Sequence, residues 1–228
     1  MTESIEATEV PEQTLNPRVL LVDDHDLFRT GLRNLLEEEG VDVVGEAAAG
    51  DEALRHVREL QPDVVVMDLN MPGMTGVEAT KRIVAHAPLT RVVVLTISDQ
   101  DADVMEAIFA GACGYLLKDA SIEDVMQGIR SAAVGESLIS PMIAAKVLER
   151  VRASTASPDA AEAIRSELSD REVQVLKLIA NGKDNSQIAG DLHISPKTVK
   201  NHISNILMKL QIENRIQAAV YAVRSGIV

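Results

Sequence analysis

Scarce cysteine and a lack of long apolar runs limit what kind of protein this sequence can encode. Cys113 is the one cysteine, so no disulfide can form within the chain, and we expect a buried, unreactive thiol in a reducing compartment. No apolar run approaches the ~20 residues that a membrane-spanning helix needs. The acidic segment 1–16 lacks the basic start and apolar core of a signal peptide. We therefore expect a cytoplasmic protein without a membrane partner, whose residues 1–16 form a disordered tail.

Glycine-rich phosphate loops are also missing. The sequence contains neither a P-loop nor a dinucleotide fingerprint, which argues against a nucleotide-binding protein. It does contain enough apolar material for real cores, because 46% of its 228 residues are hydrophobic and 25% are charged. This balance is typical of a globular protein, and the length predicts two domains or one large one.

Charge is unevenly distributed along the chain. Residues 166–228 hold eight basic and six acidic side chains, a net charge of +2, which leaves −15 for the rest because the total is −13. An acidic body joined to a slightly basic C-terminal part indicates two units with different partners.

Short apolar runs alternate with amphipathic stretches over residues 17–135. The runs predict strands at Arg18–Val22, Val41–Ala47, Val64–Met67, Val92–Thr96 and Gly114–Leu117. Helical patterns follow them at Leu27–Glu39, Gly50–Leu60, Gly76–Ala85, Gln100–Ala110 and Ile122–Val134. This (βα)5 order predicts an α/β domain, a doubly wound parallel sheet with right-handed crossovers.

The rest of the chain is predicted to be helical. Residues 136–165 combine a helix at Pro141–Arg152 with a flexible linker at Ala153–Ala163, which is rich in alanine, serine and proline. Residues 166–228 form a small all-α domain with helices at Asp170–Ala180, Ser186–Leu192, Pro196–Leu210 and Arg215–Arg224. Ser169 and Glu172 make a capping box, and Ser195 is the expected cap of the helix that begins with Pro196.

Polar side chains follow four of the predicted strands. Asp23 and Asp24 follow the first strand, Asp68 follows the third and Lys118 the fifth, while Thr96 ends the fourth after the run Val92–Leu95. Because the carboxyl ends of parallel strands line the ligand crevice of an open sheet, we expect these groups to converge. Carboxylates suit Mg²⁺, Asp68 suits a nucleophile that accepts a phosphoryl group, and Lys118 and Thr96 suit phosphate oxygens. Taken singly, each residue is an ordinary strand or helix cap, but their shared edge favours a site.

Residues 18–134 resemble the receiver domain of bacterial two-component response regulators. The matching stretches are Val-Leu-Leu-Val-Asp-Asp-His at 19–25, Met-Asp-Leu-Asn-Met-Pro-Gly-Met at 67–74, Val-Leu-Thr at 94–96 and Gly-Tyr-Leu-Leu-Lys-Asp at 114–119. The resemblance implies that Asp68 is the phosphoacceptor and that Asp24, Asp68 and the Asn70 carbonyl bind Mg²⁺ directly, with Asp23 helping through water. It also implies that Thr96 and Tyr115 form a switch pair and that Lys118 contacts the phosphate. Asp26 departs from the pattern, because the closest relatives usually carry proline there, and it adds a negative charge near the metal site.

The helix predicted at Pro196–Leu210 has the composition of a DNA recognition helix. It carries three lysines and a histidine but no acidic residue, and its polar side chains can bond phosphates or base edges. Residues 168–226 resemble the LuxR-type helix-turn-helix of the NarL/FixJ response regulators, through Leu168-Ser169-Asp170-Arg171-Glu172, Ile188-Ala189, Ile194-Ser195, Thr198-Val199-Lys200-Asn201-His202 and Lys209-Leu210. Met208 and Gln211 depart from it, since the family often has a basic residue and a turn former at these places.

This second resemblance assigns roles within the helical domain. Base edges are assigned to Lys200, Asn201 and Ser204, and phosphates to Lys197, Thr198, His202, Asn205 and Lys209. A dimer contact is assigned to Ile216, Ala219, Val220 and Val223, although completion of the small core explains these four residues equally well.

Together the resemblances imply a DNA-binding transcriptional regulator, not an enzyme, that is switched when a histidine kinase phosphorylates Asp68. The implied partners are double-stranded DNA, the sensor kinase, a second copy of the phosphorylated chain, and RNA polymerase. We hypothesise that the unphosphorylated receiver masks the recognition helix. One alternative is a constitutive or partner-controlled DNA-binding regulator with a silent receiver. Another is an Asp-nucleophile phosphatase, which Asn70 disfavours because such enzymes usually need a second acid two residues after the nucleophile.

Overall fold

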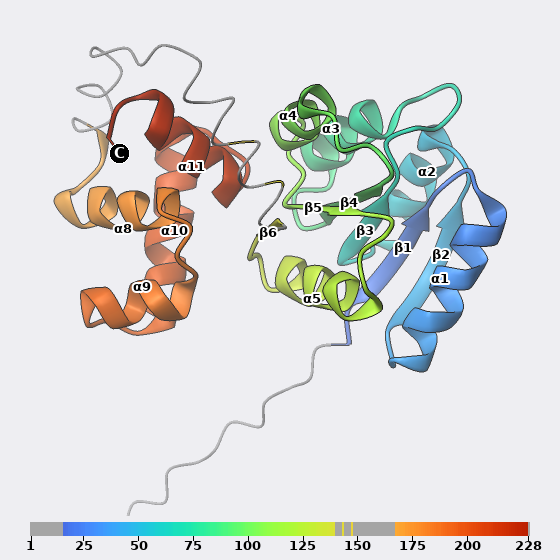
Figure 1. The fold of residues 1–228 in the computed structure, drawn as a ribbon, viewed down its shortest axis with the longest axis horizontal. Coiled ribbons are helices and arrows are strands. Elements are labelled where there is room, and N and C mark those ends of the chain that lie inside the picture. Colours follow the sequence, from blue (N-terminus) through green and yellow to red (C-terminus); the bar gives the residue numbers. More distant parts are fainter. Residues whose placement is uncertain (1–15, 140–142, 144–146, 148–166, 228) are drawn as a thin grey trace, which may run out of the picture.

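The computed structural model describes residues 16–139, 143, 147 and 167–227. The α/β domain runs from blue to yellow-green in Figure 1, and the helical domain from orange to red. Most of the predicted tail, most of the predicted helix Pro141–Arg152 and the whole linker Ala153–Ala163 lie outside the described residues. Within the described ranges, no helix combines the length and apolar character that crossing a membrane requires.

One parallel sheet forms the centre of the α/β domain. Its strands are β1 (Arg18–Val22), β2 (Asp42–Ala47), β3 (Val64–Met67), β4 (Arg91–Thr96), β5 (Gly114–Leu117) and β6 (Leu138–Ile139). Their order is β2-β1-β3-β4-β5-β6, with every pairing parallel. The first five confirm the predicted strands to within one residue, whereas β6 was missed because two residues carry no readable periodicity.

Helices cover both faces of the sheet, as predicted for a doubly wound fold. On one face, Val19 and Leu21 belong to the core beneath α1 (Asp26–Glu38) and α5 (Ile122–Ala133). The alternate strand residues pack on the other face against α2 (Gly50–Leu60), α3 (Gly76–His86) and α4 (Asp101–Phe109). Cys113 is buried as expected, and burial raises the pKa of its thiol to about 11, which keeps it protonated and unreactive at neutral pH.

The helical domain contains α8 (Asp170–Ala180), α9 (Asn185–Leu192), α10 (Pro196–Leu210) and α11 (Arg215–Arg224). Both predicted caps are confirmed: Ser169 and Glu172 form a capping box, and Ser195 accepts from the Thr198 amide at 3.1 Å. Gln211 ends α10 in the left-handed region, at φ 54°. A side chain there costs about 1–2 kcal/mol relative to glycine.

Helix α11 also joins the helical domain to the α/β domain. Its Ile216 and Val220 are buried in the apolar cluster that contains Val104, Ala107 and Ile108 of α4. Two side-chain amides complete the junction: Asn214 Nδ2 donates to the Ala112 carbonyl at 2.9 Å, and Gln217 Nε2 donates to the Ile108 carbonyl at 2.8 Å. We call this contact the α4–α11 interface.

Candidate functional site

The carboxyl edge of the sheet brings the predicted acidic residues together. Asp23 and Asp24 directly follow β1, and Asp68 directly follows its neighbour β3. Asp68 is 2% exposed and Asp23 5%. Carboxylate oxygens of Asp23, Asp24 and Asp68 lie within 4.8 Å of one another, together with a ring nitrogen of His25. Burial makes such a cluster costly unless a cation compensates it.

Lys118 supplies part of that compensation. It follows β5, and its Nζ lies 2.6 Å from Asp23 Oδ2 and 3.2 Å from Asp68 Oδ2. The ammonium also sits 4.7 Å from the centroid of the Phe28 ring, so one side of it rests on an aromatic face. One lysine, 10% exposed, between two carboxylates leaves the edge with net negative charge once Asp24 is included.

Backbone amides orient the two buried carboxylates. The His25 amide donates to Asp23 Oδ1 at 2.9 Å, and the Leu69 amide donates to Asp68 Oδ1 at 2.9 Å. In both residues the other oxygen, Oδ2, is the one that contacts Lys118. Lys118 therefore faces one oxygen of each buried carboxylate.

The residues present fit a divalent cation. Asp24 Oδ1 is buried without a hydrogen-bond donor, although His25 Nδ1 lies 2.9 Å away outside hydrogen-bonding geometry. Hard carboxylate oxygens with room for water are the donor set that Mg²⁺ prefers. The structure adds His25 to the predicted cluster, but its side chain is 65% exposed and imidazole is a poor ligand for Mg²⁺. The Asn70 carbonyl stays a prediction.

Thr96 and Tyr115, the predicted switch pair, lie between this edge and α4. Thr96 ends β4 and is fully buried, and its Oγ1 lies 3.4 Å from the Ser98 amide that can donate to it. The Tyr115 hydroxyl donates to the Ser98 carbonyl at 2.8 Å. Burial, followed by the charges of nearby Asp103, Asp99 and Asp68, raises the pKa of Tyr115, so the hydroxyl stays protonated and available as a donor. Ser98 in turn bonds Asp103 of α4 through its Oγ.

The predicted DNA-binding residues lie on α10 as the sequence indicated. Val199, Ile203, Ile206 and Leu210 face inward and are buried. The exposed members of the predicted set are Lys197, Lys200, Asn201, Ser204, Asn205 and Lys209, while Thr198 and His202 are partly exposed. Two of these lysines form ion pairs with other residues of the chain. Lys200 Nζ lies 3.5 Å from Glu136 Oε1 of the α/β domain, and Lys209 Nζ lies 2.7 Å from Glu172 Oε2. The recognition helix is thus largely uncovered in this arrangement.

The residues of the predicted dimer contact are more buried than the predicted DNA-binding residues of the recognition helix. Ile216 and Val220 are buried in the α4–α11 interface, and Ala219 and Val223 are partly buried. Ala218 and Ala222, on another side of α11, complete the core of the helical domain. The sequence left open whether α11 pairs or packs, and the structure adds a third role, which is contact with the receiver-like domain.

Two sequence families match the chain. Residues 19–130 match the response regulator receiver domain, and residues 166–222 match the bacterial regulatory proteins of the luxR family. The transcriptional regulatory protein LiaR of Bacillus subtilis (strain 168) is 45% identical over 212 residues, which cover 92% of this chain and 99% of LiaR. This chain belongs to the LuxR-family response regulators. It is a transcriptional regulator of a two-component system, with a receiver and a LuxR-type DNA-binding domain.

Solved structures extend the likeness of this response regulator to complexes on DNA. An RcsB–DNA complex is 28% identical with a TM-score of 0.54, and the match covers 93% of this chain and 100% of that one. A structure of two RcsB dimers bound to two parallel DNAs is 27% identical with a TM-score of 0.53, over 92% and 98% of the two chains. LiaR is named as a transcriptional regulatory protein.

The Glu172 carboxyl makes the stability of the helical domain depend on pH. Burial alone would raise the pKa of this carboxyl, but Lys209 and Ser169 outweigh burial and bring the pKa below its ordinary value. A folded-state pKa below the unfolded value of about 4.3 gives stability that is present above pH ~4.3 and lost as the pH falls through the folded pKa.

We therefore expect the unfolding free energy of the helical domain to fall more steeply for the wild type than for Glu172→Gln between about pH 5 and pH 3. Urea unfolding of the full chain, followed through NMR signals of α8 and α10, measures both slopes. Parallel slopes would show that Glu172 carries no such linkage.

Proposed function

We propose that Asp68 accepts a phosphoryl group from a histidine kinase and that this event controls DNA binding. The observation that carries the proposal is the buried Asp68 carboxylate with Lys118 Nζ 3.2 Å from its Oδ2. Asp68 Oδ2 would attack phosphorus, a P–O bond would form as the P–N bond to the kinase imidazole breaks, and the imidazole nitrogen would take up a proton. Lys118 neutralises charge on the transferred group.

Bound Mg²⁺ would neutralise further charge on the phosphoryl oxygens. Asp24 and Asp68 would hold it directly, Asp23 through water and Asn70 through its carbonyl. The carboxylates within 4.8 Å of one another and the orphaned Asp24 oxygen support this assignment. The Thr96 hydroxyl would donate a hydrogen bond to the phosphoryl group. This bond would draw the hydroxyl away from the Ser98 amide.

The route from Asp68 to the DNA-binding domain would run through Tyr115 and α4. Leu69, next to Asp68, belongs to the same apolar cluster as Tyr115, and that cluster includes Ile216 and Val220 of α11. Tyr115 also bonds Ser98, whose side chain bonds Asp103 at the start of α4. Movement of Thr96 and Tyr115 would therefore disturb the surface on which α11 rests. Phosphorylation would free α11 for dimer contact.

This arrangement favours control through α11 rather than by covering α10. Most of the recognition helix is exposed, and Lys200 contacts the receiver side through Glu136. Two freed α11 helices would pair, and two recognition helices would reach half-sites about 34–36 Å apart, one turn of DNA. Lys200, Asn201 and Ser204 would contact bases, and the remaining predicted residues would contact phosphates.

The kinase would approach beside Lys118. A groove of about 300 Å³ opens there, lined by Leu27, Phe28, Leu35, Lys118 and Ile122 among others. Leu27 is 88% exposed and Leu35 47%, which suits an amphipathic helix laid against the groove. The proposal further includes a cytoplasmic location and RNA polymerase as the downstream partner, in keeping with relatives that regulate transcription.

DNA affinity with and without phosphorylation tests the proposed function. The probe is a mixed-sequence duplex, titrated at several salt concentrations before and after treatment with a small acyl phosphate and Mg²⁺. We expect tighter binding after treatment and a steeper fall of log K with log salt, because two domains then contact phosphates. Equal affinities at every salt concentration would contradict control by phosphorylation and favour a constitutive regulator with a silent receiver.

A further inference from the structure

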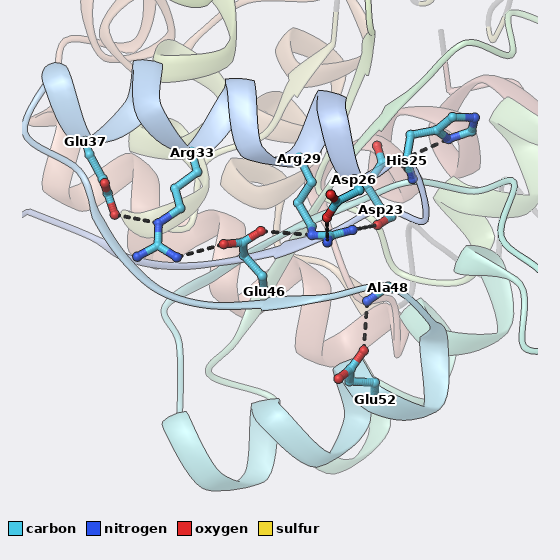
Figure 2. A network of polar contacts seen from close by, with 9 residues as sticks. All are labelled: Asp23, His25, Asp26, Arg29, Arg33, Glu37, Glu46, Ala48 and Glu52. Atoms are coloured by element: carbon cyan, nitrogen blue, oxygen red, sulfur yellow. Dashed lines mark hydrogen bonds and ion pairs between the residues drawn. The ribbon is translucent and has the colours of Figure 1, made fainter.

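We infer that Arg29 is a positioning residue for phosphoryl transfer, because it holds the main chain of the loop that carries Asp23 and Asp24. Figure 2 shows its guanidinium between the loop, the start of α1 and strand β2. Nη1 donates to the Asp23 carbonyl at 2.6 Å, and Nη2 donates to Asp26 Oδ1 at 2.6 Å. The inference rests on the proposed function of the Asp68 site.

The Arg29 side chain is built into the fold rather than lying on its surface. It is 12% exposed, and its Nε donates to Glu46 Oε2 of β2 at 2.9 Å. Glu46 is held by its other oxygen as well, since Arg33 Nη1 donates to Oε1 at 2.7 Å. Arg33 is in turn bonded to Glu37 at 2.8 Å (Figure 2). A planar guanidinium with donors fixed in a fork suits such a threefold contact, and an ammonium does not.

Asp23 is thereby fixed from both of its polar ends. Its carbonyl faces Arg29, while its carboxylate accepts from the His25 amide and contacts Lys118. The charge of Arg29 is matched locally by Asp26 and Glu46, so its effect on the metal site is one of position more than of long-range attraction. Loss of Arg29 would free the peptide group after Asp23 to rotate. The carboxylates of Asp23 and Asp24 would then no longer be held in the orientation that binds the metal.

Arg33 offers a matched control. It touches the same Glu46 and lies on the same helix, but its hydrogen bonds go to Glu46 and Glu37 and none that the structure describes goes to the Asp23 loop. Loss of either arginine removes an ion pair with Glu46. Only the Arg29 variants remove the contact with Asp23.

The test compares Arg29→Met, Arg29→Lys, Arg33→Met and Arg33→Lys with the wild type in the full chain. Calorimetry gives the Mg²⁺ dissociation constant, phosphorylation by a small acyl phosphate gives the Mg²⁺ dependence and the maximal rate separately, and thermal unfolding gives stability. We expect Mg²⁺ affinity to fall about tenfold or more in Arg29→Met, as for other residues that orient metal ligands. Arg29→Lys should fall by less, and both Arg33 variants should stay within about twofold.

Every outcome of this comparison either supports or overturns the positioning role of Arg29. If Arg29→Met does not fold, the comparison of Arg29→Lys with Arg33→Lys carries the test. Mg²⁺ affinity that is unchanged in the Arg29 variants, or reduced equally in the Arg33 variants, overturns the positioning role. Failure of the proposed function looks different, because the wild type itself would then gain no phosphoryl group at Asp68.

Discussion

Asp68→Asn is expected to reduce phosphoryl incorporation from a small acyl phosphate to background. The Asp68 carboxylate lies buried at this edge beside Lys118, and an amide oxygen in its place cannot form the acyl phosphate. The substitution keeps the size of the side chain, so the fold should persist. Intact-mass measurement after incubation with donor and Mg²⁺ reports the gain of one phosphoryl group per chain.

Asp51→Asn is the matched control for this experiment. Asp51 lies exposed in the first turn of α2, and the substitution makes the same change of acid to amide outside the cluster of Asp23, Asp24 and Asp68. We expect wild-type incorporation in the control. A label that persists in Asp68→Asn would assign the phosphoacceptor to another carboxylate of the cluster, with Asp23 and Asp24 the first to test.

Gln217→Glu is expected to switch on DNA binding without phosphorylation. The Gln217 amide is buried and donates to the Ile108 carbonyl across the α4–α11 interface at 2.8 Å. Glutamate has the same shape but no donor, so the closed arrangement would bury a carboxylate against a carbonyl oxygen. Breaking a buried polar pair in this way costs about 3 kcal/mol, which shifts the equilibrium toward the open arrangement by about 100-fold. Titration of a mixed-sequence duplex measures the gain.

The added negative charge needs its own control, because it opposes DNA binding. Gln174→Glu adds the same charge to the same domain at an exposed position of α8. We expect this control to bind DNA slightly more weakly than the wild type, and Gln217→Glu to bind more tightly than both. If the two variants weaken binding alike, α11 is not restrained by its contact with the receiver.

The secondary structure was predictable because its signals are local. Buried parallel strands read as continuous apolar runs such as Val64–Met67, and serine caps mark the helix starts at Ser169 and Ser195. The acidic edge was also predictable, since topology alone sends the carboxyl ends of neighbouring strands to one place. Lys118 was found for the same reason, although it lies fifty residues beyond Asp68 in the chain.

Contacts between distant segments carried no such signal. The Gln217 amide meets a backbone carbonyl 109 residues away, and a carbonyl belongs to every residue type. Arg29 and Glu46 resemble ordinary surface charges in the sequence, yet they meet because α1 packs beside β2. His25 was also not predicted, although it adjoins the predicted carboxylates and a histidine next to two aspartates is a local pattern.

Sedimentation velocity of the wild type and Asp68→Asn, each before and after treatment with a small acyl phosphate and Mg²⁺, shows whether phosphorylation of Asp68 produces the dimer. We expect that only the wild type gains mass, since phosphorylated Asp68 releases α11 from α4 and exposes Ile216 and Val220 for pairing. A wild type that takes up the phosphoryl group and keeps its original mass, or an Asp68→Asn variant that dimerises as the wild type does, would contradict it.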